Sequence, residues 1–237
     1  PNQLCRTIAH RKITATELFS EIPKFAFEEL QRRSPSFCPE IKYTTRSELE
    51  FVKTGSKYSV DVEAIGMTPT FLHFSEAAYM EDEAKLVNSI ESLSRNNVGI
   101  VESTADGKGN WFHTTFMDNW SLLQQGKEPE WYPMFFAWFD DPDNCIPWTP
   151  GTLLHFPEEC LEQRRKYRNS DGSQITNDQL LFWDRKKLAL GPLLPEKYPS
   201  HPEEAFIHNT GKVYPEFSVA QNVVPPIRFA DYKIAMD

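Results

Sequence analysis

A carboxylate and two hydroxyl groups stand after two short apolar runs of the sequence. Glu76 follows the run 70–74 after one serine, and Ser103 and Thr104 follow the run 98–102. If the two runs are neighbouring parallel strands, their carboxyl ends meet at one edge of the sheet, and the three side chains share a cleft. In nucleotide hydrolases built this way, the carboxylate polarises the attacking water and a short hydroxyl on the next strand senses the γ-phosphate. The alternative is that Glu76 is a solvated strand end, the commoner role for such a residue.

The segments around these residues have the pattern of a strand, a helix and a second strand. Residues 70–74 form one apolar run, and residues 98–102, ending in Glu102, form another. Between them, residues 81–93 carry apolar side chains at helical spacing. This order of elements makes parallel sheets with helices on their faces. The sequence therefore predicts an α/β fold.

Further elements are expected on both sides of this unit. A helix should begin near a capping box of Thr14 and Glu17 and kink or restart at Pro23. Residues 49–62 alternate like a β-hairpin. Beyond the second strand we expect a short aromatic helix over 111–120 and a buried strand over 131–139. Residues 157–190 should be mostly charged helix, divided by a loop at 169–173.

The overall composition excludes some classes of protein and leaves others open. The 237 residues include 25 basic and 34 acidic side chains, a formal net charge of −9, which argues against a basic coat for nucleic acid over the whole chain. No apolar run reaches the ~18 residues of a membrane span. The four cysteines are far apart and form no CxxC pair, so a zinc site is not expected. Neither GxxxxGKS nor GxxxxGKT, the phosphate-cradling P-loop, occurs in these residues.

Five stretches of the sequence resemble, in the same order, the large terminase subunit of tailed bacteriophages. That family is the ATP-driven motor that packages DNA into the capsid, and the resemblance covers roughly residues 5–237. The stretches are FLHFSEAAYM (71–80), GIVESTADGKGNWFH (99–113), YPMFFAWFDDP (132–142), ITNDQLLFWDRKKL (175–188) and EKYPSHPEEAF (196–206). Five motifs in one order are far more specific than any one of them.

The resemblance implies an ATPase domain followed by a nuclease domain of the ribonuclease H type. Residues 1–145 would be a partial P-loop NTPase core of the RecA-like (ASCE) type, truncated at its N-terminus. Residues 146–212 would be a helical linker subdomain, and residues 213–237 a connector and the first strand of the nuclease domain. The P-loop and most of the nuclease domain would then lie outside this chain.

The resemblance also implies roles for particular residues. Leu72, His73, Phe74 and Ser75 would form the Walker B strand, and Glu76 would be the catalytic carboxylate. Ser75 stands where many P-loop ATPases have an aspartate that binds Mg²⁺, so its role toward the metal would be indirect. From its place on the strand alone, His73 is expected to be a core histidine with its hydrogen bonds satisfied.

Beyond the Walker B strand, the implied roles concern coupling, a second metal site and a neighbouring subunit. Ser103, Thr104 and Ala105 match the motif that couples hydrolysis to motion, and Asp237 would be the first metal-binding acid of the nuclease. Ile65 stands where the family often has an arginine that reaches into a neighbouring subunit, and Arg46 is one candidate to replace it.

The implied cofactors are ATP and Mg²⁺. The implied partners are double-stranded viral DNA, the portal protein, the small terminase subunit and further copies of the chain in a ring on the capsid; no membrane is involved. The protein would act in the cytoplasm of the infected bacterial host, bound transiently to the procapsid and absent from the mature virion. Four basic residues of one charged helix either contact DNA phosphates or form a solvated face: Arg164, Arg165, Lys166 and Arg168.

Two other functions remain open at this point. One is a non-catalytic scaffold for protein interactions, with a degenerate NTPase fold that has no phosphate cradle. The other is a helicase-type ATPase of related core fold, although the further arginine- and glutamine-containing motifs expected of helicases are not found beyond the second strand.

Overall fold

The computed structural model describes residues 2–64, 66–93, 97–149 and 155–206 of the chain. The strands are β1 (Leu4–Ala9), β2 (Ile41–Thr44), β3 (Glu48–Phe51), β4 (Lys57–Asp61), β5 (Phe71–Ser75) and β6 (Val98–Glu102). The α-helices are α1 (Lys12–Phe19), α2 (Phe25–Arg33), α3 (Glu83–Glu91), α4 (Trp111–Gln124), α5 (Glu158–Lys166), α6 (Asn177–Leu190), α7 (Leu194–Lys197) and α8 (Pro202–Ala205). Shorter helical turns are η1 (Ser20–Lys24), η2 (Ala77–Tyr79), η3 (Trp138–Asp140) and η4 (Gly191–Leu193). No helix in the described part of the chain is long and apolar enough to cross a membrane.

The strands form one mixed sheet in the order β2-β3-β4-β1-β5-β6. β4, β1, β5 and β6 run parallel, whereas β2 and β3 form an antiparallel margin beside β4. The register pairs Ala9 with Ser75 and Ser75 with Glu102, so three parallel strands end level with one another. The predicted α/β fold is confirmed, as are the hairpin at β3–β4, the strands β5 and β6, and the helix α3 between them.

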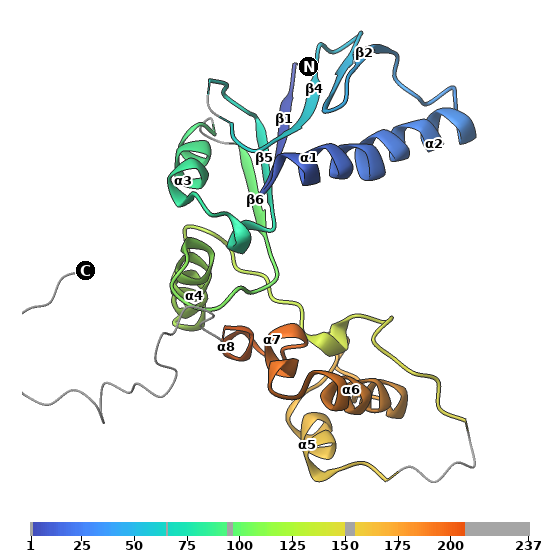
Figure 1. Cartoon of the computed structure of the whole chain (residues 1–237), viewed down its shortest axis with the longest axis vertical. Coiled ribbons are helices and arrows are strands. Elements are labelled where there is room, and N and C mark those ends of the chain that lie inside the picture. Colours follow the sequence, from blue (N-terminus) through green and yellow to red (C-terminus); the bar gives the residue numbers. More distant parts are fainter. Residues whose placement is uncertain (1, 65, 94–96, 150–154, 207–237) are drawn as a thin grey trace, which may run out of the picture.

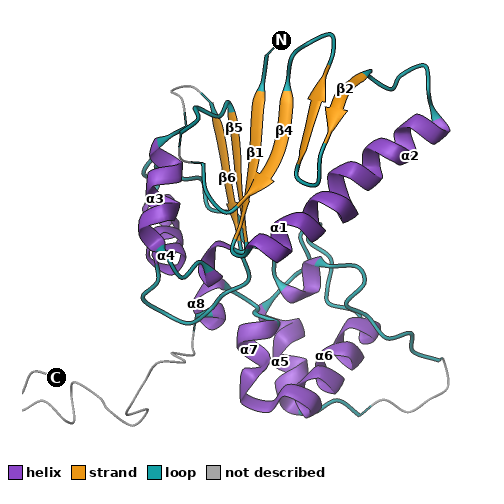
Figure 2. Ribbon diagram, turned by 45° about the horizontal axis from the view of Figure 1, so that its top comes forward, coloured by secondary structure: helices purple, strands orange, loops and turns teal. Residues whose placement is uncertain are grey.

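Two helices cover the sheet from opposite faces (Figure 2). Leu86 of α3 packs with Leu72 and Phe74 in one apolar cluster, and Phe19 of α1 packs with Val60 in another. α1 contacts β1 and β4. The face of the sheet that α1 covers continues over β5 and β6 beyond the helix. On this part of the face the apolar side chains Val98 and Ile100 are 56% and 46% exposed.

A group of helices beyond residue 135 forms a third hydrophobic cluster, the helical unit, which lies below the sheet in Figure 1. Its core includes Trp138, Cys160, Leu180 and Trp183. α8 joins the helical unit to α4, because Phe206 at its end packs against Phe112 and Phe116. The domain boundary expected at 145/146 stays a prediction, and the expected connector and nuclease strand at 213–237, with Asp237, lie outside the described residues.

Two local predictions are wrong. Residues 131–137 belong to no described strand, and η3 follows them. Proline has no N–H to donate to a ladder, so Pro133 weakens the strand, and Trp138 packs into the helical unit instead. The capping box is also wrong, because α1 begins at Lys12 and so places Thr14 inside the helix. The expected restart at Pro23 is confirmed, since η1, a π-helical turn, joins α1 to α2.

Candidate active site at the carboxyl edge of the sheet

Glu76 lies immediately after β5 in a left-handed backbone conformation, with φ 58° and ψ 49°. In this region the Cβ of an L-residue crowds the following carbonyl oxygen, so residues other than glycine adopt it at a cost. Only Asn2 shares a positive φ with Glu76 among the described non-glycine residues. Strained backbone of this kind persists where the surroundings hold it, and it is concentrated at functional sites.

The carboxylate of Glu76 meets the residues that follow β6. Its Oε2 atom accepts hydrogen bonds from Ser103 Oγ at 3.3 Å, from Thr104 Oγ1 at 3.3 Å and from the Thr104 backbone N–H at 3.4 Å. These distances are at the long end of the range for such bonds, so the three donors can turn to another oxygen. The proposed catalytic acid and the two proposed sensor hydroxyls are therefore in direct contact.

The same hydroxyls connect the site to the turn after β5. Ser103 Oγ accepts a hydrogen bond from the Ala78 backbone N–H at 3.1 Å. Tyr79 Oη lies 3.1 Å from Thr104 Oγ1, and it donates to the Ala105 carbonyl at 3.4 Å. The ends of β5 and β6 are thus joined by side chains as well as by the backbone ladder.

The remaining residues predicted to form a Walker B strand divide between the two faces of the sheet. Leu72 and Phe74 are fully buried beneath α3. His73 and Ser75 point to the opposite face, because side chains alternate along a strand. The expectation that His73 lies in the core is wrong, because its side chain is 27% exposed. It lies on the face of the sheet that α1 covers, but beyond that helix. Its hydrogen bonds are nonetheless satisfied, as predicted.

His73 belongs to a chain of polar side chains that crosses the four parallel strands. Tyr58 Oη on β4 lies 2.8 Å from Thr7 Oγ1 on β1, and Thr7 Oγ1 lies 3.3 Å from His73 Nδ1. His73 Nε2 in turn lies 3.5 Å from Glu102 Oε1 on β6. We call this chain the cross-strand ladder. It ends at Glu102, one residue before the two hydroxyls that the sequence predicts to be sensors.

The environment of Glu102 favours the charged carboxylate. His73 makes the largest contribution to lowering the pKa of Glu102, and partial burial opposes it. Hydrogen bonds from the Ser75 hydroxyl and the Glu76 backbone N–H lower this pKa further.

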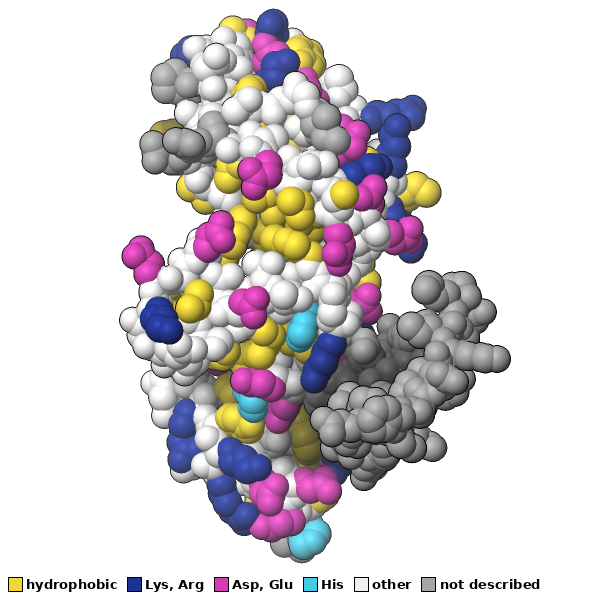
Figure 3. All heavy atoms as spheres, turned by 90° about the vertical axis from the view of Figure 1, so that its left-hand side faces the viewer, with side chains coloured by type: hydrophobic (Ala, Val, Ile, Leu, Met, Phe, Trp, Pro, Cys, Tyr) yellow, Lys and Arg dark blue, Asp and Glu magenta, His cyan; other side chains and the backbone are white. Residues whose placement is uncertain are grey.

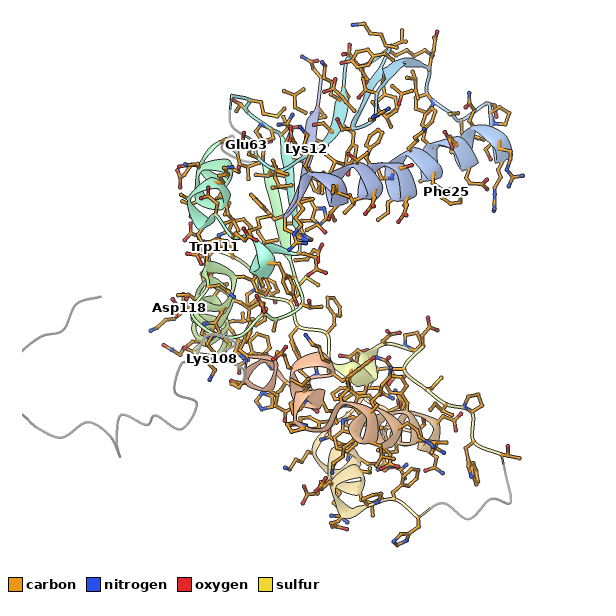
Figure 4. All side chains as sticks on the ribbon, in the orientation of Figure 1. Lys12, Phe25, Glu63, Lys108, Trp111 and Asp118 are labelled. Carbon is orange, nitrogen blue, oxygen red and sulfur yellow. The ribbon has the colours of Figure 1, made fainter. Side chains whose placement is uncertain are left out.

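Three basic side chains at the same edge were not singled out from the sequence. His10, Arg11 and Lys12 follow β1, and the register that pairs Ala9 with Ser75 places them beside Glu76. His10 Nδ1 is buried and has no hydrogen-bond partner among the described residues. Lys12, labelled in Figure 4, lies at the start of α1. The signal was present, because an apolar run ending in His-Arg-Lys is a strand end like the other two.

Arg46, the candidate for reaching into a neighbouring subunit, lies exposed in the turn between β2 and β3. β3 is antiparallel to β4, so its first residue, Glu48, lies level with Ser59 near the carboxyl end of β4. Arg46 is therefore at the same edge as Glu76, with β4 and β1 between them. Ile65 lies outside the described residues.

The four basic residues expected on one charged helix lie at and just beyond the end of α5. Arg164 donates to Asn177 Oδ1 at 2.6 Å, and Arg165 pairs with Glu158 at 2.5 Å. Arg168 donates to the backbone carbonyl of Arg164 at 2.7 Å. Lys and Arg side chains gather over the helical unit, at the lower end of the face in Figure 3. A contact with DNA phosphates stays a prediction.

The side chains at the sheet edge offer few ligands for a metal ion. The described residues contain no cluster of three or more His, Cys, Asp or Glu side chains that could hold an ion. Ser75, Glu76 and Thr104 do offer only oxygen donors, the kind that Mg²⁺ prefers. Mg²⁺ usually keeps several waters and binds through one or two carboxylates and substrate phosphates, so this edge fits Mg²⁺ that arrives with a nucleotide.

No protein-family model matches the chain, and no curated protein matches it. Solved structures of phage large terminases are similar to it. The ATPase domain of the Thermus phage P74-26 large terminase is 16% identical, with a TM-score of 0.48 over 85% of this chain and 77% of that one. The large terminase of a thermophilic bacteriophage in complex with ADP is 13% identical, with a TM-score of 0.43 over 75% of this chain. The similarity spans about 40% of the length of that terminase.

Proposed function

We propose that this chain carries the hydrolytic carboxylate of an ATP-driven DNA-packaging motor, the large terminase subunit of a tailed phage. The observation that carries the proposal is the contact between Glu76 and the Ser103–Thr104 pair. A strained carboxylate at one strand end meets two hydroxyls at the next. The five ordered motifs of the sequence support the family.

The chemistry follows from this contact. Glu76 holds the attacking water by accepting its hydrogen bond. It takes up the proton of this water as the water oxygen bonds to the γ-phosphorus and the bond from that phosphorus to the bridging oxygen of ADP breaks. Before nucleotide binds, the hydroxyls of Ser103 and Thr104 donate hydrogen bonds to the Glu76 carboxylate. Once a γ-phosphate is present, these hydroxyls can donate to its oxygens instead, and the carboxylate can then accept a hydrogen bond from the water. Loss of the γ-phosphate returns both hydroxyls to Glu76. Coupling would pass through Ala105, whose carbonyl is tied to Tyr79.

Mg²⁺ bound with the phosphates would supply charge neutralisation of the phosphoryl group. In the proposal, the role of the Ser75 hydroxyl toward this ion would be indirect, because a neutral hydroxyl replaces the usual aspartate. The phosphate cradle would come from a P-loop outside residues 1–237, since neither form of that motif occurs within them.

The finer parts of the proposal concern the whole protein. It would package double-stranded viral DNA as a homo-oligomeric ring, together with the portal protein and the small terminase subunit. It would work in the host cytoplasm, on the procapsid. A nuclease that cuts the packaged DNA would begin near Asp237.

The test is Glu76→Gln in the complete terminase, with Glu128→Gln as the matched control. Glutamine keeps the size of the side chain but cannot take up a proton, so ATP turnover should fall by at least ~100-fold, whereas ATP affinity should stay within about twofold. Glu128 is exposed in the loop after α4, and its variant should hydrolyse ATP normally. Normal turnover by Glu76→Gln would refute the assignment, and a wild-type protein that hydrolyses no ATP would favour the interaction scaffold.

A further inference from the structure

We propose that Tyr79 is a positioning residue for Thr104: its phenol donates a hydrogen bond to the Thr104 hydroxyl and so directs the proton of that hydroxyl toward Glu76 or a γ-phosphate. This inference rests on the proposed function of Glu76. It adds a role for a residue that contacts neither the water nor the phosphates in the mechanism above.

The hydroxyl of Thr104 lies between two partners. Its Oγ1 atom is 3.3 Å from Glu76 Oε2 and 3.1 Å from Tyr79 Oη. An ionised carboxylate can only accept, so the single proton of Thr104 points to Glu76 and the lone pairs of its oxygen face the second partner. Tyr79 is therefore the donor in the contact between the two hydroxyls.

The hydroxyl of Ser103 has the same arrangement, with a donor from the backbone. Its Oγ atom accepts from the Ala78 N–H at 3.1 Å and donates to Glu76 Oε2 at 3.3 Å. Each hydroxyl thus accepts one hydrogen bond from η2 and donates one to the same carboxylate oxygen. The donor to Ser103 belongs to the main chain, whereas the donor to Thr104 is the side chain of Tyr79 and can be removed by substitution.

Three further contacts hold Tyr79 in place. Its backbone N–H donates to the Glu76 carbonyl at 3.1 Å, within the turn that begins at Glu76. Its ring lies beside the ring of His10, with 6.4 Å between the centroids. Its phenol has the Ala105 carbonyl as a second acceptor, at 3.4 Å. The phenol can therefore stay in position while the Thr104 hydroxyl turns from the carboxylate to a phosphate oxygen.

This arrangement affects the reaction through Thr104. A hydroxyl whose oxygen already accepts a hydrogen bond presents its proton in a fixed direction, so the donor is oriented before charge develops on the phosphate. Without the phenol, the Thr104 hydroxyl can rotate and lose part of this orientation. A single neutral hydrogen bond contributes enough free energy for a change of ~3–10-fold in rate.

The test uses the complete terminase and the variant Tyr79→Phe, alone and combined with Thr104→Val. Phenylalanine fills the same space at this half-buried position and keeps the ring beside His10, so the variant loses only the hydroxyl. Tyr79→Phe should lower kcat for ATP by ~3–10-fold and leave KM within about twofold of the wild type. The control is Tyr132→Phe, at a position 73% exposed, which should match the wild type.

The combined variant separates positioning from a general effect on the fold. Thr104→Val removes the sensor hydroxyl and should lower kcat by at least ~10-fold. Adding Tyr79→Phe to Thr104→Val should then change kcat by less than about twofold, because the phenol has no hydroxyl left to orient. An equal loss of kcat from Tyr79→Phe with and without the Thr104 hydroxyl would refute the positioning role.

The results also distinguish this inference from the proposed function. If Glu76→Gln abolishes turnover but Tyr79→Phe leaves kcat unchanged, the positioning role alone is refuted. If Glu76→Gln hydrolyses ATP normally, the proposed function fails, and the role of Tyr79 fails with it.

Discussion

Replacing Glu76 by glycine should leave the protein more stable than replacing it by alanine. Both substitutions remove the carboxylate and its hydrogen bonds to Ser103 and Thr104, so those losses cancel in the comparison. What remains is the backbone, which has φ 58° at this position. Alanine keeps the Cβ that crowds this conformation, whereas glycine has none.

The size of the difference follows from two opposing terms. A left-handed conformation costs an L-residue roughly 1–2 kcal/mol. Glycine loses more conformational freedom on folding than alanine, which costs roughly 0.5–1 kcal/mol. The glycine variant should therefore be more stable by about 0.75 kcal/mol, within a range of roughly 0–1.5 kcal/mol. For a chain of this length, ~0.75 kcal/mol corresponds to about 1.5–3 °C in Tm.

The assay is thermal or urea unfolding of the two variants under the same conditions, with Glu128→Gly and Glu128→Ala as controls. Glu128 is not among the described residues with positive φ, so there alanine should equal or exceed glycine. If Glu76→Ala is more stable than Glu76→Gly, as expected for the pair of variants at Glu128, the backbone at this position is not held in the left-handed region. The strain inferred for Glu76 would then be refuted.

Two further predictions concern the sheet. The pKa of Glu50 is lowered to about 2, mainly by its hydrogen bond to Lys42 at 2.6 Å. Because this pKa in the folded protein lies below the ordinary value of 4.5, the ionised Glu50 stabilises the fold above pH 4.5. The stabilisation is lost as the pH falls from 4.5 toward 2. Glu50→Gln should therefore flatten the fall in urea midpoint over that range, and an unchanged pH dependence would contradict the ion pair. Gly99→Ala would bring a Cβ within 3.0 Å of the Trp131 ring and should lower the free energy of unfolding by roughly 1–3 kcal/mol. A second substitution, Trp131→Phe, should restore part of this loss. An unchanged free energy of unfolding in Gly99→Ala would show that the Trp131 ring moves aside without cost.

The meeting of Glu76 with Ser103 and Thr104 was predictable from the sequence for a simple reason. Two apolar runs separated by a helix make a parallel pair, and parallel strands end at the same edge. The left-handed backbone of Glu76 was not predictable, because glutamate has no preference for that region. It results from contacts that exist only in the folded chain.

The surroundings of His73 show a second limit of sequence patterns. Alternation places His73 on one face of its strand, but which helix covers that face depends on the order of strands in the sheet. β1 lies in the middle of the sheet, so α1 covers β1 and β4 rather than β5 and β6. The prediction of a strand over 131–139 was wrong for a related reason, because a short apolar run does not by itself require a strand that pairs with a sheet.

The central place of β1 also determines when the sheet can assemble during synthesis. Gln3 bonds to Ser56, 53 residues later, and Leu4 bonds to Thr70, 66 residues later. At about 5–20 residues per second, the ribosome needs roughly 3–13 s to make the partners of β1 after β1 itself. During that interval its apolar side chains have neither neighbouring strand. Nascent chains stalled before residue 56 should therefore be the ones that bind chaperones most strongly.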